Sequence, residues 1–554
     1  MSRWMQATLE YFRRRNRVWL LSLFAAVCLL YLPFVGNPFF YEDLNFFSLG
    51  SARHFIHTDF QFDLRWLPYA SLDWTAEYFS DAVPHLFHLG NTLLHLVNVI
   101  LLFFLLRRLL LAVNSAASES VAVKGAWFGA LIFACHPVAV YAVGYVVQRS
   151  IVLATLFALV MQLSYLQALL SGQKRWLALA SLAYFMAIFS DEHSVMFPVL
   201  LMAMTLLLRA QNRLGIKVTW LSLGGFSLMG LLLIMRMQGV FGSPYATIAS
   251  LMPLQVERSY AVQSLDMLTQ MGLYFKYLAL MLIPNPGWMS VDMRIQGLSG
   301  WSDWLGWFGA AAFIAYGVFG FRLLQRGGNK GLAGLALLSP WLLFLVEFFS
   351  HRAQQSFMLY RSYFWLPGLM LLVPLLLLKL PGRRTQYALV LVVLLLIPVA
   401  WNRLWTFADS YRLWNDAALL LSADPAKGRN QNNMPEAGAE RILFNRAMAL
   451  VEAQQWTDAA TELKQVVRLY PQLSPARHAL GMAYYNLKQY DEALVQFDAA
   501  IQQSPGFAGS YYGKGLALMS LHRLEQVPAL FRKACTLSNE IDACLLADLT
   551  GGKK

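Results

Sequence analysis

Two adjacent carboxylates, Glu42 and Asp43, follow the first apolar segment of the chain, in the stretch 39–45 (FFYEDLN). Ionisable side chains at the edge of a bilayer are costly unless they are solvated, paired or used in function. A transfer reaction to a hydroxyl group needs a base that accepts the proton, and either carboxylate could serve. We predict that this pair is catalytic and favour Asp43 as the base; the alternative is a solvated loop.

Several cationic and polar residues could bind an anionic substrate. A phosphate leaving group requires positive charge, which Arg149, Arg361 and Arg65 could supply, and His193 could donate a hydrogen bond to phosphate or sugar. The alternative for Arg149 and Arg361 is ion pairing with Asp191 or Glu192, and the two roles are compatible. The predicted substrate-binding residues are Arg149, Arg361, His193, Glu192, Asp191, His88, Asn91 and Arg65.

Four polar residues, His88, Asn91, His95 and Asn98, step by three or four along one apolar segment. This spacing places them on one face of a helix. The two deeper residues, His95 and Asn98, are expected to form hydrogen bonds between helices. The two outer residues, His88 and Asn91, are expected to line a site.

No P-loop, Rossmann glycine run, zinc-ligand spacing or Ser-His-Asp arrangement stands out in the sequence. A divalent cation, Mg²⁺ or Mn²⁺, could bridge the acidic pair and phosphate oxygens. The sequence offers too few clear oxygen ligands to require such a cation. We therefore predict no required cofactor and leave the divalent cation as an open alternative.

The composition is that of a polytopic membrane protein: 58% of the 554 residues are hydrophobic, 14% are charged, and the mean hydropathy is +0.47. The net charge of +13 comes from short basic clusters between apolar runs. That distribution follows the positive-inside rule and argues against a nucleic-acid partner. It predicts a cytoplasmic N-terminus, about eleven spans and one re-entrant or interfacial helix over 263–284. The acidic pair, Arg149, His193 and Arg361 then share the outer face.

A 34-residue period follows the apolar part, relating Gly481 to Gly515 and Pro471 to Pro505. This is the tetratricopeptide length, in which small residues allow paired helices to approach closely. We predict an all-α chain with a transmembrane catalytic domain over 1–401, a first outer loop with interfacial helices over 36–88, a linker with a juxtamembrane helix over 402–439, and about three repeats over 440–550. A disulfide between Cys535 and Cys544 could form.

Several stretches resemble the transmembrane and tetratricopeptide-repeat protein O-mannosyltransferases and their bacterial relatives, within the GT-C glycosyltransferases. They are residues 84–95 (PHLFHLGNTLLH), 135–138 (CHPV), 148–150 (QRS), 190–194 (SDEHS), 274–284 with Asp292, and 361–363 (RSY) followed by Leu366 and Pro367. The resemblance implies a GT-C-like bundle, a polyprenyl-phosphate sugar donor, inversion at the anomeric carbon, and one carboxylate of the acidic pair as base. The chain departs from the family at Glu42, Gln148 and Asp191, where Asp, Gly and Lys are usual.

These observations lead to one predicted function, an integral-membrane glycosyltransferase of the bacterial inner membrane. It would transfer a sugar from the polyprenyl-phosphate carrier to an acceptor on the periplasmic face. The expected acceptor is a protein Ser or Thr hydroxyl docked on periplasmic repeats, and a lipid or polysaccharide acceptor stays open. The rival function is a non-catalytic repeat scaffold, anchored in membrane lipids, for envelope or pilus assembly.

Overall fold

The computed structural model describes residues 17–40, 43, 46, 65–79, 83–237, 260–293, 298, 300–348, 357–422, 439–538, 544–546 and 549. Within these ranges the chain is all-helical, as predicted, and contains no strand. It divides into two compact units. The bundle unit comprises Met1–Val291 and Gly297–Ala408, and the repeat unit comprises Asp292–Gln296 and Asp409–Lys554.

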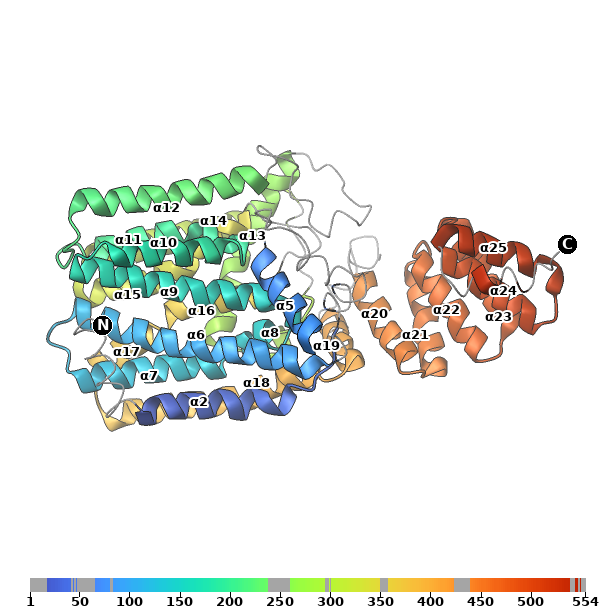
Figure 1. Cartoon of the computed structure of the whole chain (residues 1–554), viewed down its shortest axis with the longest axis horizontal. Helices are drawn as coiled ribbons and strands as arrows, with labels where there is room; N and C mark the ends of the chain where they lie inside the picture. Colours follow the sequence, from blue (N-terminus) through green and yellow to red (C-terminus); the bar gives the residue numbers. More distant parts are fainter. Residues whose placement is uncertain are drawn as a thin grey trace. The chain divides into compact units, whose positions relative to one another are not determined.

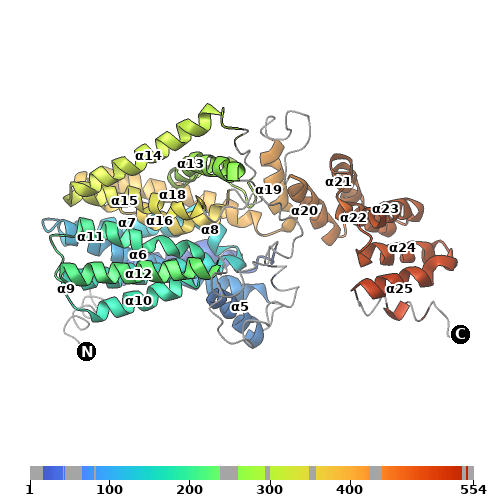
Figure 2. The same ribbon diagram turned by 90° about the horizontal axis from the view of Figure 1, so that it is seen from above.

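Long helices run side by side in the bundle unit, and α12 lies at its edge (Figure 1). The helices of this unit in the described residues are α2 (Arg17–Tyr31), α5 (Trp66–Phe79), α6 (Pro84–Val113), α7 (Glu119–Cys135), α8 (Pro137–Val143), α9 (Arg149–Ser171), α10 (Arg175–Ile188), α11 (Phe197–Leu207), α12 (Ile216–Met237), α13 (Tyr260–Leu282), α14 (Trp304–Gln325), α15 (Gly328–Phe344), α16 (Ser362–Leu369), α17 (Leu372–Lys379) and α18 (Arg383–Thr406). The short helices α5 and α8 both lie at one end of the bundle (Figures 1 and 2).

Short 3₁₀ turns begin or end many of these helices. They are η1 (Leu32–Phe34), η3 (Val146–Gln148), η4 (Glu192–Met196), η6 (Pro286–Trp288), η7 (Leu345–Phe348) and η9 (Leu359–Arg361). A 3₁₀ turn tightens the backbone and changes the direction of the side chains it carries. Three of these turns, η3, η4 and η9, carry or adjoin predicted site residues.

The α7–α8 pair is bent by 60° at His136 and Pro137. Proline disfavours the helical conformation of the residue before it, and His136 is extended, with φ −72° and ψ 128°. The His136 ring replaces the lost helical contact, because its Nδ1 accepts the N–H of Val138 at 3.2 Å. Its Nε2 lies 3.1 Å from the carbonyl oxygen of Met281, so the bend also contacts α13.

Eight helices of the described residues are long and apolar enough to cross a membrane, and a ninth is added if the bent pair is one span. Two further apolar helical segments, Arg175–Ile188 and Glu192–Leu207, are shorter than these. The sequence predicted about eleven spans, whereas eight or nine helices of the described residues reach the length and apolarity that spanning requires; α13, predicted to be re-entrant or interfacial, is not among them. The helix α18 continues to Thr406, past the predicted domain boundary at 401.

The predicted polar face of α6 is buried along its whole length. His95 Nδ1 lies 2.8 Å from the Tyr363 hydroxyl oxygen, and Asn98 Nδ2 donates to the same oxygen at 3.0 Å. Asn98 Nδ2 also donates to the carbonyl oxygen of Val152 at 3.0 Å. The hydrogen bonds between helices that were predicted for the deeper half of this face are therefore present.

The repeat unit consists of α19 (Ser410–Ser422) and three consecutive helix pairs. The pairs are α20 (Ala439–Glu452) with α21 (Trp456–Leu469), α22 (Ser474–Asn486) with α23 (Tyr490–Gln503), and α24 (Ala508–Ser520) with α25 (Val527–Ser538). The 34-residue period thus gave the correct helix pairs. Of the linker and juxtamembrane helix predicted over 402–439, residues 410–422 form α19, and residues 423–438 lie outside the described residues.

Glycines facing one buried phenylalanine hold the second and third pairs together. Phe497 is fully buried, and a Cβ atom on Gly481 or Gly513 would lie 2.7 or 2.5 Å from its ring. A Cβ atom on Gly515 would likewise lie 2.7 Å from the ring of Phe531. The period in the sequence therefore records this close packing of small residues against aromatic rings.

Near the C-terminal end of the array, Cys535 of α25 forms a disulfide with Cys544, as the sequence allowed. The nearby Leu546 packs on a hydrophobic cluster of the last pair that contains Leu518, Val527 and Phe531. The disulfide therefore holds Leu546 and its neighbours close to the last helix pair.

Replacing Gly481 with valine should destabilise the repeat unit by about 1–3 kcal/mol, because the added atoms overlap the Phe497 ring. Amide hydrogen exchange of the full chain should become about 10- to 100-fold faster in α22 and α23. The matched control is Gly506→Val, since a Cβ at Gly506 meets nothing within 4 Å. Equal exchange rates in the two variants would contradict the packing described for Phe497.

The stability of the repeat unit should also fall in mild acid. Burial lowers the pKa of His478 to about 4, and its ring lies between Ser510 and the Phe507 ring. The unfolded chain, with a histidine pKa of about 6.5, then binds more protons than the folded chain between these values. Stability is therefore lost as the pH falls from about 6.5 towards 4, by at most about 3 kcal/mol.

Urea titration followed by limited proteolysis of the repeat unit, at several pH values, tests this expectation. The His478→Gln variant should lose much of the pH dependence, whereas the exposed His522→Asn variant should keep it. The interpretation is wrong if His478→Gln and the wild type respond equally to acid.

Candidate functional site

Six charged side chains of the bundle unit form a continuous series of contacts in which positive and negative charges alternate; this series is called the ion-pair chain below. Its first member, Glu192 of η4, accepts two hydrogen bonds from Arg65, from Nε at 3.0 Å and from Nη2 at 2.7 Å. Arg65 Nη2 also lies 3.8 Å from Asp191 Oδ2. Arg65 precedes α5, and its φ is 59°. This value lies in the left-handed region, which residues other than glycine rarely adopt because the Cβ atom is crowded there. The ion pairs hold the start of α5 in this conformation.

The ion-pair chain continues through His193 to Arg361. The Nδ1 atom of His193 lies 2.6 Å from Asp191 Oδ1, and its Nε2 atom lies 3.0 Å from Glu347 Oε1. The other oxygen of Glu347 accepts a hydrogen bond from Arg361 Nη1. The order along the chain is therefore Glu192, Arg65, Asp191, His193, Glu347 and Arg361.

Most members of this ion-pair chain are inaccessible to solvent: Asp191 and Glu347 are 1% exposed, His193 is 2% exposed and Arg361 is 5% exposed. Burial alone would raise the pKa of the Asp191 carboxyl. The charges of His193 and Arg65 and the hydrogen bonds from His193 outweigh that effect, so the pKa of Asp191 lies below its usual value. Asp191 is thus held as a carboxylate.

Arg149, at the start of α9, is buried differently. Its Nε donates to Asn91 Oδ1 at 2.8 Å, Nη1 donates to the Ser71 carbonyl at 3.1 Å, and Nη2 donates to the Phe87 carbonyl at 3.0 Å. All three partners are neutral. Among the residues that the structure describes, no carboxylate pairs with this guanidinium.

The outer part of the α6 face positions this arginine. Besides accepting from Arg149, Asn91 points its Nδ2 at the carbonyl oxygens of Val143, Tyr145 and Val146, at 3.3 to 3.4 Å. His88 instead has its Nε2 3.0 Å from the Asn37 carbonyl oxygen. Of the two residues predicted to line a site, Asn91 contacts a predicted site residue and His88 contacts backbone.

Of the acidic pair, Asp43 is described and fully buried, and Glu42 lies outside the described residues. Asp43 Oδ1 accepts the backbone N–H of Val147 at 2.7 Å. Two residues further along, Arg149 begins α9, and Ser150 Oγ donates to Asp191 Oδ2 at 3.3 Å. The segment 147–150 therefore connects Asp43 and Arg149 with the ion-pair chain.

The structure changes one predicted pairing. The alternative role for Arg149 and Arg361 was ion pairing with Asp191 or Glu192; Arg65 pairs with these two carboxylates instead, while Arg361 pairs with Glu347. Glu347 was not predicted as a site residue. It lies near the end of an apolar segment, where an ionisable side chain is itself a signal of function.

Three neighbouring side chains, Asp191, Glu192 and His193, bring possible ligand atoms within 4.8 Å of one another. Their partners do not suit a metal ion in this arrangement. Both ring nitrogens of His193 face carboxylate oxygens, and the cation Arg65 already contacts the two carboxylates. A metal would need an unprotonated ring nitrogen and carboxylates available to it, so these residues do not fit a divalent cation as they stand.

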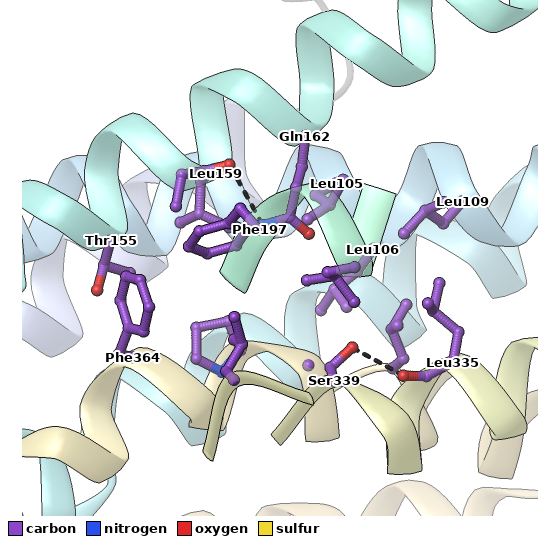
Figure 3. A pocket seen from close by; sticks show the side chains of 16 residues that line it. Leu105, Leu106, Leu109, Thr155, Leu159, Gln162, Phe197, Leu335, Ser339 and Phe364 are labelled. Atoms are coloured by element: carbon purple, nitrogen blue, oxygen red, sulfur yellow. Dashed lines mark hydrogen bonds between the residues drawn. The ribbon is translucent and has the colours of Figure 1, made fainter. Parts of the chain in front are cut away.

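A narrow apolar cavity lies between helices of the bundle and is lined by none of the predicted site residues (Figure 3). Its few polar groups are satisfied within their own helices. Thr155, Gln162 and Ser339 donate to the carbonyl oxygens one turn earlier, at 2.7, 3.2 and 2.7 Å. The predicted site residues therefore lie outside this cavity.

The Arg65–Glu192 contact should be energetically coupled because it is largely removed from water. Replacing Arg65 alone by methionine leaves carboxylates without their cation and should cost about 1–3 kcal/mol. Adding Glu192→Met should recover part of this loss. Apparent melting temperatures in lipid nanodiscs measure the coupling.

The matched control is the Arg107–Glu119 pair, whose carboxylate side chain is 41% exposed and whose coupling should stay below about 1 kcal/mol. Strictly additive effects of the Arg65 and Glu192 substitutions would show that this contact does not couple the two residues.

Comparison with known proteins identifies the repeats. The tetratricopeptide repeat family model matches residues 444–508 and 478–540. Solved structures similar to part of the chain include MamA (residues 41 to end) from Desulfovibrio magneticus RS-1, with 23% identity, 26% of this chain and 72% of that chain covered, and a TM-score of 0.22. Another is YrrB, a TPR protein with an unusual peptide-binding site, with 22% identity, 31% and 86% covered, and a TM-score of 0.22.

No curated protein matches the chain at a significant level. The chain is therefore an all-helical protein with helices apolar and long enough to span a membrane, followed by tetratricopeptide repeats.

Proposed function

We propose that the chain is an integral-membrane glycosyltransferase of the GT-C type, which transfers a sugar from a polyprenyl-phosphate donor to a hydroxyl acceptor with inversion. One observation carries this proposal. A buried carboxylate, Asp43, and a buried guanidinium bonded only to neutral groups among the described residues, Arg149, are both held by the segment 147–150. A transfer from a phosphate carrier needs these two groups.

In the proposed reaction, the acceptor oxygen attacks the anomeric carbon and its proton passes to the Asp43 carboxylate. The bond between the anomeric carbon and the phosphate oxygen breaks, and polyprenyl phosphate leaves with the electron pair. General base catalysis of this kind contributes about 10²- to 10⁴-fold. The hydrogen bond from the Val147 N–H orients the carboxylate before the substrate arrives.

Arg149 is proposed to bind the donor phosphate. Its charge has neutral partners in the described residues, so an arriving anion would supply the counter-charge that the fold does not. Contacts from Asn91, Ser71 and Phe87 fix the guanidinium in advance, which is the condition for strong stabilisation of developing charge.

Arg65, His193 and Arg361 are proposed to contribute less to donor binding than the sequence suggested. Each of them already contacts a carboxylate, and attracting a phosphate would require that contact to weaken. We propose that these residues, with Asp191 and Glu192, maintain the shape of the site and contact the sugar.

The repeats are proposed to recruit a protein acceptor in the periplasm of a bacterial cell. The Cys535–Cys544 disulfide supports an oxidising compartment for this unit. Tetratricopeptide arrays stack helices into extended surfaces that bind other proteins. The match to the repeat family equally favours the second candidate, a membrane-anchored scaffold without catalysis.

A deletion strain complemented with variants tests the proposal, with mass spectrometry of envelope proteins and glycans as the measurement. Asp43→Asn and Arg149→Gln should each lower product by about 10²-fold or more, because they remove the base and the phosphate counter-charge. Arg107→Gln is the control, since Arg107 pairs with the more exposed Glu119.

The proposal fails if both site variants restore the wild-type glycan profile. The scaffold function gains support if the deletion changes no glycan and its phenotype is restored by Asp43→Asn and Arg149→Gln but not by a chain shortened at Ala408.

A further inference from the structure

His193 lies between two carboxylates that come from different parts of the chain. Asp191 precedes η4, and Glu347 belongs to η7, 154 residues away. Both ring nitrogens are within hydrogen-bonding distance of a carboxylate oxygen, at 2.6 and 3.0 Å. Each ring nitrogen therefore faces a hydrogen-bond acceptor.

A proton count follows from this geometry. A neutral imidazole has one N–H and one lone pair, and the lone pair would face an ionised oxygen at hydrogen-bonding distance. That repulsion is avoided only when a second proton lies between the ring and a carboxylate. With this proton on the ring, the ion-pair chain contains three cations and three anions. The cations are Arg65, His193 and Arg361, and the anions are Asp191, Glu192 and Glu347.

The contact reaches the proposed reaction site through Asp191. While Oδ1 of Asp191 faces His193, its Oδ2 accepts the hydroxyl of Ser150 at 3.3 Å. Ser150 follows Arg149 in the first turn of α9. Glu347, His193, Asp191 and Ser150 therefore form a hydrogen-bonded path from η7 to the turn that carries Arg149.

We propose that Glu347 is a positioning residue that, together with Asp191, keeps His193 doubly protonated and thereby fixes the first turn of α9 through Asp191 and Ser150. Glu347 also contacts Arg361, so it joins η4, η7 and η9 at one point. The imidazolium is an ion-paired structural cation here, and it is neither a base nor a metal ligand.

Among the residues that the structure describes, the charged and titratable groups around His193 come from five elements. Asp191 and Glu192 lie at η4, Glu347 lies in η7, Arg361 lies in η9, and Arg65 lies before α5. Tyr277 of α13 accepts the N–H of Met358 at 2.7 Å near the same turn. Glu347 and Asp191 are the two that contact the ring, so removing the Glu347 charge should expose the ring proton on Nε2 to loss.

The protonation state stands without the proposed glycosyl transfer, whereas the effect of Glu347 on catalysis rests on it. Solid-state NMR of the full-length chain in lipid bilayers, labelled with ¹⁵N-histidine, measures the protonation state directly. The His193 signals are assigned by difference from a His193→Gln variant. Both ring nitrogens of wild-type His193 should be protonated at about pH 8, where an ordinary histidine is neutral.

In Glu347→Gln, His193 should become a neutral tautomer at the same pH, with one protonated nitrogen, whereas Glu347→Asp should restore the double protonation. A neutral wild-type His193 at about pH 8 would overturn the proposal without any variant, so a misfolded variant leaves the test intact. An unchanged imidazolium in a folded Glu347→Gln chain would overturn the role of Glu347.

The catalytic consequence is a separate measurement. With a polyprenyl-phosphate sugar as donor, Glu347→Gln should lower kcat about 10- to 100-fold, change KM less, and acquire a pH profile that Glu347→Asp does not show. If the NMR result holds and no variant or wild type transfers sugar, the proposed function fails and the protonation assignment survives. If transfer occurs and Glu347→Gln is as active as the wild type, the positioning role fails alone.

Discussion

Burying charge among apolar helices is the constraint on which the bundle unit depends. An isolated ion removed from water costs several kcal/mol, so each buried charge needs a partner of opposite sign or a set of well-placed dipoles. Glu192, Arg65, Asp191, His193, Glu347 and Arg361 satisfy this requirement by alternating in sign along one path. Arg149 satisfies it in the other way, with amide and carbonyl oxygens. That difference distinguishes Arg149, whose described partners are neutral, from the residues whose charges are already paired.

The positions of these charges follow from interruptions of the helices. Glu347 and Arg361 lie in the 3₁₀ turns η7 and η9, while His193 lies in η4 and Arg149 directly follows η3. A continuous helix distributes side chains around its axis and along its length. A 3₁₀ turn at the junction allows a charged side chain to leave the apolar helix face and meet residues from other helices. The breaks in the bundle are therefore what bring distant parts of the sequence together.

Much of the architecture could be predicted because it produces regular spacings of residues over short stretches of the sequence. The 34-residue spacing identified the repeats, the three- and four-residue spacing of His88, Asn91, His95 and Asn98 identified a buried helix face, and apolar runs identified the helices. The pairing of charges was not local. Arg65 and Glu192 are 127 residues apart, and His193 and Glu347 are 154 residues apart. Their contacts depend on the order in which helices pack, which no short pattern encodes. Glu347 was therefore missed, and the alternative role considered for Arg361 named Asp191 or Glu192 as its partner instead of Glu347.

The short C-terminal segment held by the Cys535–Cys544 disulfide has a consequence for assembly. Helical repeats grow by placing the next pair on the apolar side of the last one, and an uncovered side would accept a repeat from any source. Leu546 lies on the cluster of Leu518, Val527 and Phe531 in the last described pair. The crosslink between Cys535 and Cys544 thus keeps part of the apolar surface of this pair covered by the chain's own residues, and that part is not available to another repeat.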